Sequence, residues 1–117
     1  MKLYGIPNCN TVKKARDWLD QHAIQYEFHD FKKLGLDTAT AQSWLQQQPW
    51  EKLINRSGMT WRNLSDAEKN AVIDAASAQT LMQEKTSVIK RPIVMKDHQI
   101  ITIGFKEADY VQLFAKE

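Results

Sequence analysis

The sequence contains a single cysteine, Cys9, among its 117 residues. One thiol excludes a disulfide within the chain and favours a reducing, cytoplasmic location. Zinc is disfavoured too, because Cys9 and the scattered His22, His29 and His98 lack the spacing of metal ligands. We therefore expect no bound metal. A disulfide formed at Cys9 must be resolved by a thiol from another molecule, and glutathione is the usual small cytosolic thiol.

Long apolar runs and a strong charge bias are also missing. No segment approaches the length of a membrane span, and the N-terminus enters a strand pattern at once, without the pattern of a secretory leader. A net charge of +2 with a pI of about 8.7 is too weakly basic to predict nucleic-acid binding. With 43% hydrophobic and 26% charged residues, the composition is that of one globular domain. We expect a monomer without membrane or nucleic-acid partners.

The surroundings of Cys9 favour a reactive thiol. Residues 3–16 read as a short strand, a turn at Pro7-Asn8, the thiol and then a helix. The amides and dipole of a helix N-terminus favour an anion, so a thiol placed there tends to ionise. Lys13 and Lys14 are expected to lower the pKa of the thiol further. The alternative interpretation is a small buried apolar side chain.

The rest of the chain predicts α/β architecture. A strand-helix-strand unit at the N-terminus implies two parallel strands, and two strands joined by Asp97-His98 imply an antiparallel hairpin. In the first helix, Asn10 or Thr11 is the expected cap, and Val12, Ala15, Leu19 and Ala23 are the expected core face. Strands are expected at residues 2–5, 25–31, 93–96 and 99–104, helices at 11–22, 36–48, 65–76, 77–85 and 107–116, and a short helical turn at 50–55.

This order of elements is that of a thioredoxin-like fold with a mixed four-stranded sheet and an all-helical insertion. We expect one domain over residues 1–117, with the thioredoxin-like parts at about 1–33 and 87–117. The insertion then covers about 34–86. The four tryptophans, Trp18, Trp44, Trp50 and Trp61, are expected to be partly buried core aromatics rather than a stacking surface.

Four stretches of this sequence resemble the ArsC/Spx family, and the first is most similar to its YffB-like branch. That family contains glutaredoxin-coupled arsenate reductases and the Spx transcriptional regulators. The resemblance covers essentially the whole chain, with the motifs in the family's order. The stretches are Ile6 to Arg16, Leu53-Ile54-Asn55-Arg56, Ile89 to Val94, and Ile103-Gly104-Phe105.

The resemblance implies roles for individual residues. Cys9 matches the nucleophile, and Arg56 and Arg91 match two of three arginines that hold arsenate in the reductases. The third arginine has no match at Ile103-Gly104-Phe105, and Lys106 is only nearby. Pro92 matches a cis-proline that faces the cysteine and leaves the preceding backbone free for a peptide-like ligand.

Three functions follow from these residues and the resemblance. The first is a glutathione-dependent thiol reductase with Cys9 as nucleophile, acting on a disulfide, with no bound cofactor. Lys13, Arg56 and Arg91 then position glutathione, Asn8 and Thr11 offer hydrogen bonds to the sulfur, and Pro92 shapes the site. The second is an arsenate reductase, with an oxyanion substrate and glutaredoxin as a partner. The third is an Spx-like protein-binding regulator without catalysis.

Overall fold

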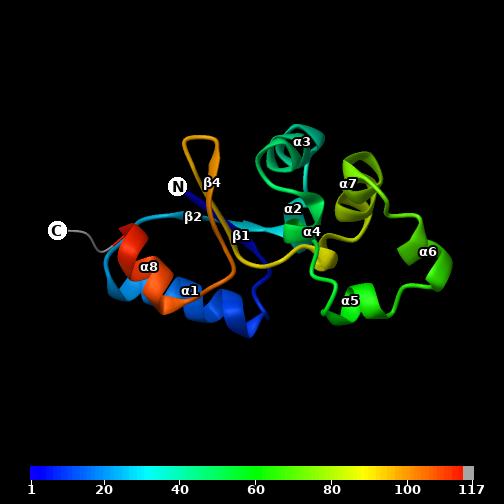
Figure 1. The fold of residues 1–117 in the computed structure, drawn as a ribbon. Coiled ribbons are helices and arrows are strands. Elements are labelled where there is room, and N and C mark those ends of the chain that lie inside the picture. The colour runs from blue at the N-terminus through cyan, green and yellow to red at the C-terminus, as the bar shows by residue number, and fades with distance from the viewer. Residues whose placement is uncertain (115–117) are drawn as a thin grey trace. The chain divides into compact units, whose positions relative to one another are not determined.

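The computed structural model describes residues 1–114 and divides the chain into two compact units (Figure 1). The sheet unit consists of Met1–Asp30 and the chain from Arg91 onward, and the helical unit consists of Phe31–Lys90. The sequence placed these boundaries near residues 33/34 and 86/87. Among the described residues, no helix combines the length and the apolar character that a membrane crossing requires.

The sheet unit confirms the predicted mixed four-stranded sheet. Its strand order is β2-β1-β3-β4, with β1 parallel to β2 and antiparallel to β3, and β3 antiparallel to β4. Residues 115–116 of the last predicted helix lie outside the described part of the chain. The elements of this unit are β1 (Lys2–Gly5), α1 (Asn10–Gln21), β2 (Glu27–Asp30), β3 (Ile93–Lys96), β4 (Gln99–Ile103) and α8 (Glu107–Phe114).

The core of the sheet unit lies between the sheet and the helices α1 and α8. Val12, Ala15 and Leu19 are fully buried, as their helical spacing predicted. Trp18 joins them and meets Tyr110 of α8 edge to face, with the ring centroids 5.5 Å apart. This aromatic contact fixes α8 against α1, so the apolar face of α1 is covered along most of its length.

One core prediction for the first helix is wrong, and the core residue of α8 is an aromatic one. Ala23 is exposed, because α1 ends at Gln21 and Ala23 adopts a left-handed φ of 55°. In α8, Val111 and Leu113 are exposed, and the buried residue is Tyr110. The phenol of Tyr110 donates to the Gly104 carbonyl oxygen at 3.4 Å, so a residue with a polar tip could take the core position.

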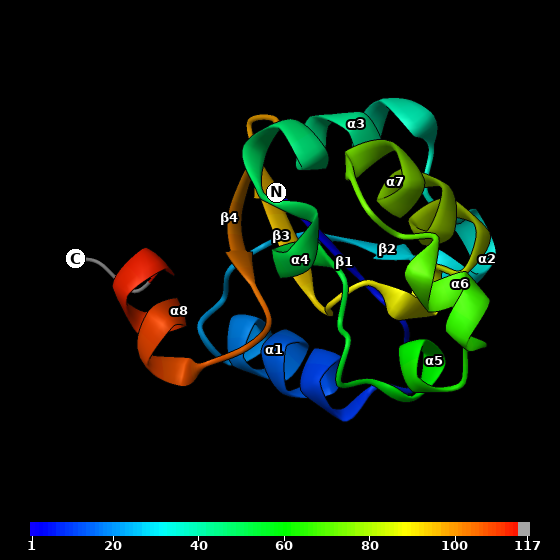
Figure 2. The ribbon, with the colours of Figure 1, turned by 45° about the vertical axis from the view of Figure 1, so that its right-hand side comes forward.

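The helical unit contains no strand longer than an isolated bridge between Ile54 and Ile89 within the described chain. Figure 2 shows α3 and α7 lying side by side. The unit consists of α2 (Phe31–Leu34), α3 (Thr38–Gln47), α4 (Trp50–Leu53), α5 (Met59–Arg62), α6 (Asp66–Asn70), α7 (Ala75–Glu84) and the 3₁₀ turn η1 (Thr86–Val88).

The helix predicted for residues 65–76 is shorter in the structure. The capping box of Ser65 and Glu68 begins α6 as expected, but α6 ends at Asn70. Asp74 then caps a new helix, α7, by accepting from the Ser77 amide at 2.9 Å. A second capping box four residues after Asn70 therefore moves the boundary between the two predicted helices from residues 76/77 to the segment before Ala75.

Candidate active site

Cys9 is itself the N-cap residue of α1, in place of the predicted Asn10 or Thr11. It has extended backbone angles, φ −104° and ψ 124°, and its carbonyl oxygen accepts the first helical hydrogen bond from the Lys13 amide at 2.9 Å. An N-cap side chain lies near the amides of the second and third helical residues. In this helix those amides belong to Thr11 and Val12, so the fold directs two backbone donors toward the sulfur.

The sheet register brings Arg91 to the same place. Tyr4 of β1 pairs with Ile93 of β3, so the end of β1 that leads to Cys9 lies beside the start of β3. Arg91 and Pro92 directly precede β3, and the bond between them is cis, as the resemblance implied. The Arg91 guanidinium lies within interaction range of the Cys9 thiol. Arg91 is half-buried, and Pro92 is buried.

The pKa of the Cys9 thiol is lowered from its ordinary value. Burial, the largest single influence, would raise it. The Val12 amide, the hydrogen bond and charge of Arg91, and the Thr11 amide together outweigh burial and lower the pKa. No cap hydrogen bond of regular geometry joins the sulfur to the described residues. The amides therefore act as nearby donors that favour the thiolate, which is the nucleophilic form.

The predicted effect of the lysines is not found. Lys13 and Lys14 are exposed, and neither is among the groups that shift the thiol pKa. Their ammonium groups are surrounded by water, which screens their charge, whereas Arg91 is half-buried and lowers the thiol pKa.

The side chains of Asn8 and Thr11 are likewise exposed. Thr11 acts on the sulfur through its backbone amide. Sequence reasoning missed the Val12 amide, because an apolar side chain gives no sign that its backbone is a donor. Recognising Cys9 as the cap would have identified this amide.

Arg56 belongs to the helical unit. The segment that precedes it is held by a short antiparallel backbone contact. The Asn55 amide donates to the Val88 oxygen at 2.7 Å, and the Lys90 amide donates to the Leu53 oxygen at 2.8 Å. The exposed Arg56 guanidinium lies 5.4 Å from the centroid of the Trp50 ring. A cation over an aromatic face is partly held in place, so Arg56 presents an oriented donor group.

No group of three or more potential metal-ligating side chains occurs among the described residues. The chemistry that this arrangement provides is that of one activated thiol. The sheet unit combines a mixed sheet, a cysteine with a stabilised thiolate at the start of its first helix, and a cis-proline before its third strand. Together these features define a thioredoxin-like protein.

The comparisons with known proteins agree with that class. The chain belongs to the ArsC family, whose model matches residues 4–113. The structure of a YffB protein is 41% identical, covers 95% of this chain and 96% of its own, and superposes with a TM-score of 0.88. An arsenate reductase (ArsC) related protein from Brucella melitensis is 47% identical, with 97% and 92% covered and a TM-score of 0.77. The global transcriptional regulator Spx of Listeria innocua is 26% identical over 90% of this chain and 79% of its own length.

Proposed function

We propose that this protein is a thiol-disulfide reductase that uses Cys9 as its nucleophile and glutathione as its co-substrate. The observation that carries the proposal is the lowered pKa of Cys9, produced by the Val12 and Thr11 amides and by Arg91 against the effect of burial. Thiolates attack disulfides, so a larger thiolate fraction at neutral pH raises the rate of the first step.

The reaction balances with thiols and disulfides alone. The Cys9 thiolate attacks one sulfur of a substrate disulfide, forming a mixed disulfide and releasing the other sulfur as a thiolate. A glutathione thiolate then attacks the substrate sulfur of the mixed disulfide and releases the Cys9 thiolate. A second glutathione cleaves the resulting substrate–glutathione disulfide. Overall, one disulfide is reduced to two thiols and two glutathione molecules become one glutathione disulfide.

Arg91 changes its partner in this scheme. While Cys9 is a thiolate, the guanidinium stabilises the sulfur. In the mixed disulfide the sulfur is uncharged, so the guanidinium can bind a glutathione carboxylate instead. Lys13 provides a further cation for the second carboxylate, and the exposed side chains of Asn8 and Thr11 provide polar contacts.

The test is direct capture of the mixed disulfide. The reduced protein is mixed with a glutathionylated peptide, quenched with acid and analysed by intact mass. We expect an adduct on Cys9 that disappears when glutathione is added, and no adduct on Cys9→Ser. Alkylation of Cys9 at the rate of an ordinary cysteine, together with no adduct, would overturn the proposal.

A role resembling that of the Spx relatives is less well supported by the residues. Those regulators usually carry a second cysteine three residues after the first, according to the resemblance. Here that position is Val12, whose side chain is fully buried in the core. A thiol-disulfide switch within this chain is therefore excluded, and Cys9 can form a disulfide only with another molecule.

A further inference from the structure

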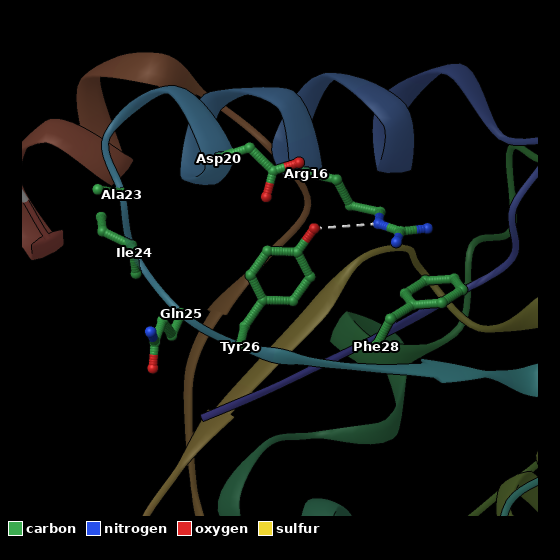
Figure 3. A pocket seen from close by; sticks show the side chains of 7 residues that line it. All are labelled: Arg16, Asp20, Ala23, Ile24, Gln25, Tyr26 and Phe28. Atoms are coloured by element: carbon green, nitrogen blue, oxygen red, sulfur yellow. Dashed lines mark hydrogen bonds between the residues drawn. The ribbon is translucent and has the colours of Figure 1, made fainter.

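A cavity of about 700 Å³ lies in the sheet unit between α1 and β2 (Figure 3). Because β2 is an edge strand of the sheet, this region faces solvent. Arg16 and Asp20 point into the cavity from α1, and Tyr26 and Phe28 approach from the opposite side. Neither Cys9 nor Arg91 lines it, so it is separate from the thiol site. Its size lies within the range of small-ligand pockets.

The guanidinium of Arg16 is held in a fixed orientation. Its Nε donates to the Tyr26 hydroxyl at 3.1 Å, and its central carbon lies 4.0 Å from the centroid of the Phe28 ring. No hydrogen bond or ion pair within residues 1–114 involves the two terminal nitrogens of Arg16. A planar guanidinium with two unused donor groups matches the two oxygens of a carboxylate.

Asp20 provides a negative charge in the same cavity. It stands one helical turn after Arg16, and Figure 3 shows its carboxylate directed toward the space between Arg16 and Tyr26. The two side chains do not pair with each other, and the Asp20 carboxylate has no hydrogen-bond partner in the described part of the chain. Both charges are therefore available to a ligand that carries one charge of each sign.

We propose that this cavity binds the head group of an α-amino acid, with its adjacent ammonium and carboxylate groups. The Arg16 guanidinium takes the carboxylate, and Asp20 takes the ammonium. The apolar part of the ligand packs against Ile24 and Phe28, which are half-buried. A free amino acid and the γ-glutamyl end of a small peptide share this head group.

An NMR titration of the reduced, ¹⁵N-labelled protein tests the proposal. The probes are L-leucine, S-methylglutathione, N-acetyl-L-leucine, which lacks the ammonium, and L-leucinamide, which lacks the carboxylate. None carries a free thiol or a disulfide, so the result does not depend on the reaction at Cys9. We expect L-leucine or S-methylglutathione to cause saturable shifts in the amides of residues 16–28. Each blocked analogue should bind at least about tenfold more weakly, as the loss of a charge-assisted hydrogen bond predicts.

Variants assign the binding to the two charges. Arg16→Gln and Asp20→Asn should each weaken binding about tenfold or more. Asp17→Asn is the matched control, because Asp17 is an exposed carboxylate on the same helix that does not line the cavity. The tighter of the two intact probes distinguishes free amino acids from γ-glutamyl peptides. Absence of saturable shifts, or equal binding by the blocked analogues, would show that Arg16 serves packing alone.

Discussion

At the scale of single residues, Arg91 is the side chain on which the reactivity of Cys9 depends most directly. Its hydrogen bond and its charge both lower the thiol pKa. Arg91→Gln should therefore raise that pKa, move the midpoint of iodoacetamide alkylation to higher pH and slow alkylation at pH 7. The matched control is Lys14→Gln, which removes an exposed charge from α1 and should leave the profile unchanged. An unshifted profile in Arg91→Gln would assign the activation to the backbone amides alone.

The same pKa makes stability depend on pH. The thiol of the folded chain ionises at lower pH than that of the unfolded chain, where the pKa is about 8.5. The thiolate therefore stabilises the fold fully above pH 8.5, and this contribution is lost as the pH falls through the folded-state pKa. Urea unfolding of wild type and Cys9→Ser across this range should show the wild type gaining stability relative to the variant as the pH rises. Parallel curves would contradict the lowered pKa.

The site also shows how far sequence reasoning reaches at this scale. Cys9 could be predicted from the strand-turn-helix pattern, whereas the role of Arg91 and the cis bond before Pro92 were implied by the family resemblance alone. The contribution of the Val12 amide depends on which residue caps the helix. A shift of the cap by one residue changes which amides face the sulfur, and the expected cap, Asn10 or Thr11, lies after the observed cap, Cys9.

At the scale of elements, the packing of β1 on α1 places the thiol. Gly5 ends β1, and a β-carbon there would lie 2.7 Å from Cγ2 of Val12, which is fully buried. Gly5→Ala should therefore lower the free energy of unfolding by about 1–3 kcal/mol, the usual cost of overpacking. Chemical denaturation measures the loss.

The double variant Gly5→Ala/Val12→Ala is the control for this mechanism. Shortening Val12 removes the atoms that the new methyl group would meet, so the two changes should cost less together than the sum of the two single changes. Strict additivity would indicate that Gly5 is required for a reason other than its distance from Val12.

Element boundaries were predicted less well than element types, and the reasons are local. The β-α-β and β-β-α parts follow from hydrophobic periodicity, which the structure confirms in Val12, Ala15 and Leu19. Periodicity could not show that α1 stops before Ala23, because a left-handed backbone ends it there. In α8, an aromatic cluster with Trp18 selects Tyr110 for the core, which aliphatic periodicity does not indicate.

At the scale of the whole molecule, the substrate depends on which electrophile the Cys9 thiolate attacks, a disulfide or an oxyanion. A tetrahedral oxyanion needs several cations around it, and the resemblance implies three arginines in the arsenate reductases. This chain has Arg56 and Arg91 at two of those positions, and Gly104 and Phe105 stand where the third is expected. Gly104 has a left-handed φ of 83° and its amide donates to the Pro92 oxygen at 2.8 Å, so the segment forms a turn into α8.

The exposed Lys106 follows this turn but does not reproduce the two-pronged binding of a guanidinium. We therefore expect little arsenate reduction, even with glutathione and glutaredoxin supplied, from a protein sample that reduces a glutathionylated peptide through Cys9. Arsenite production is measured beside peptide reduction in the same sample, with Cys9→Ser as the blank for both. Because both reactions need the same thiolate, a difference between them reports on the oxyanion site alone. Efficient arsenite production would show that two arginines suffice, and would make arsenate the preferred substrate of this thiol.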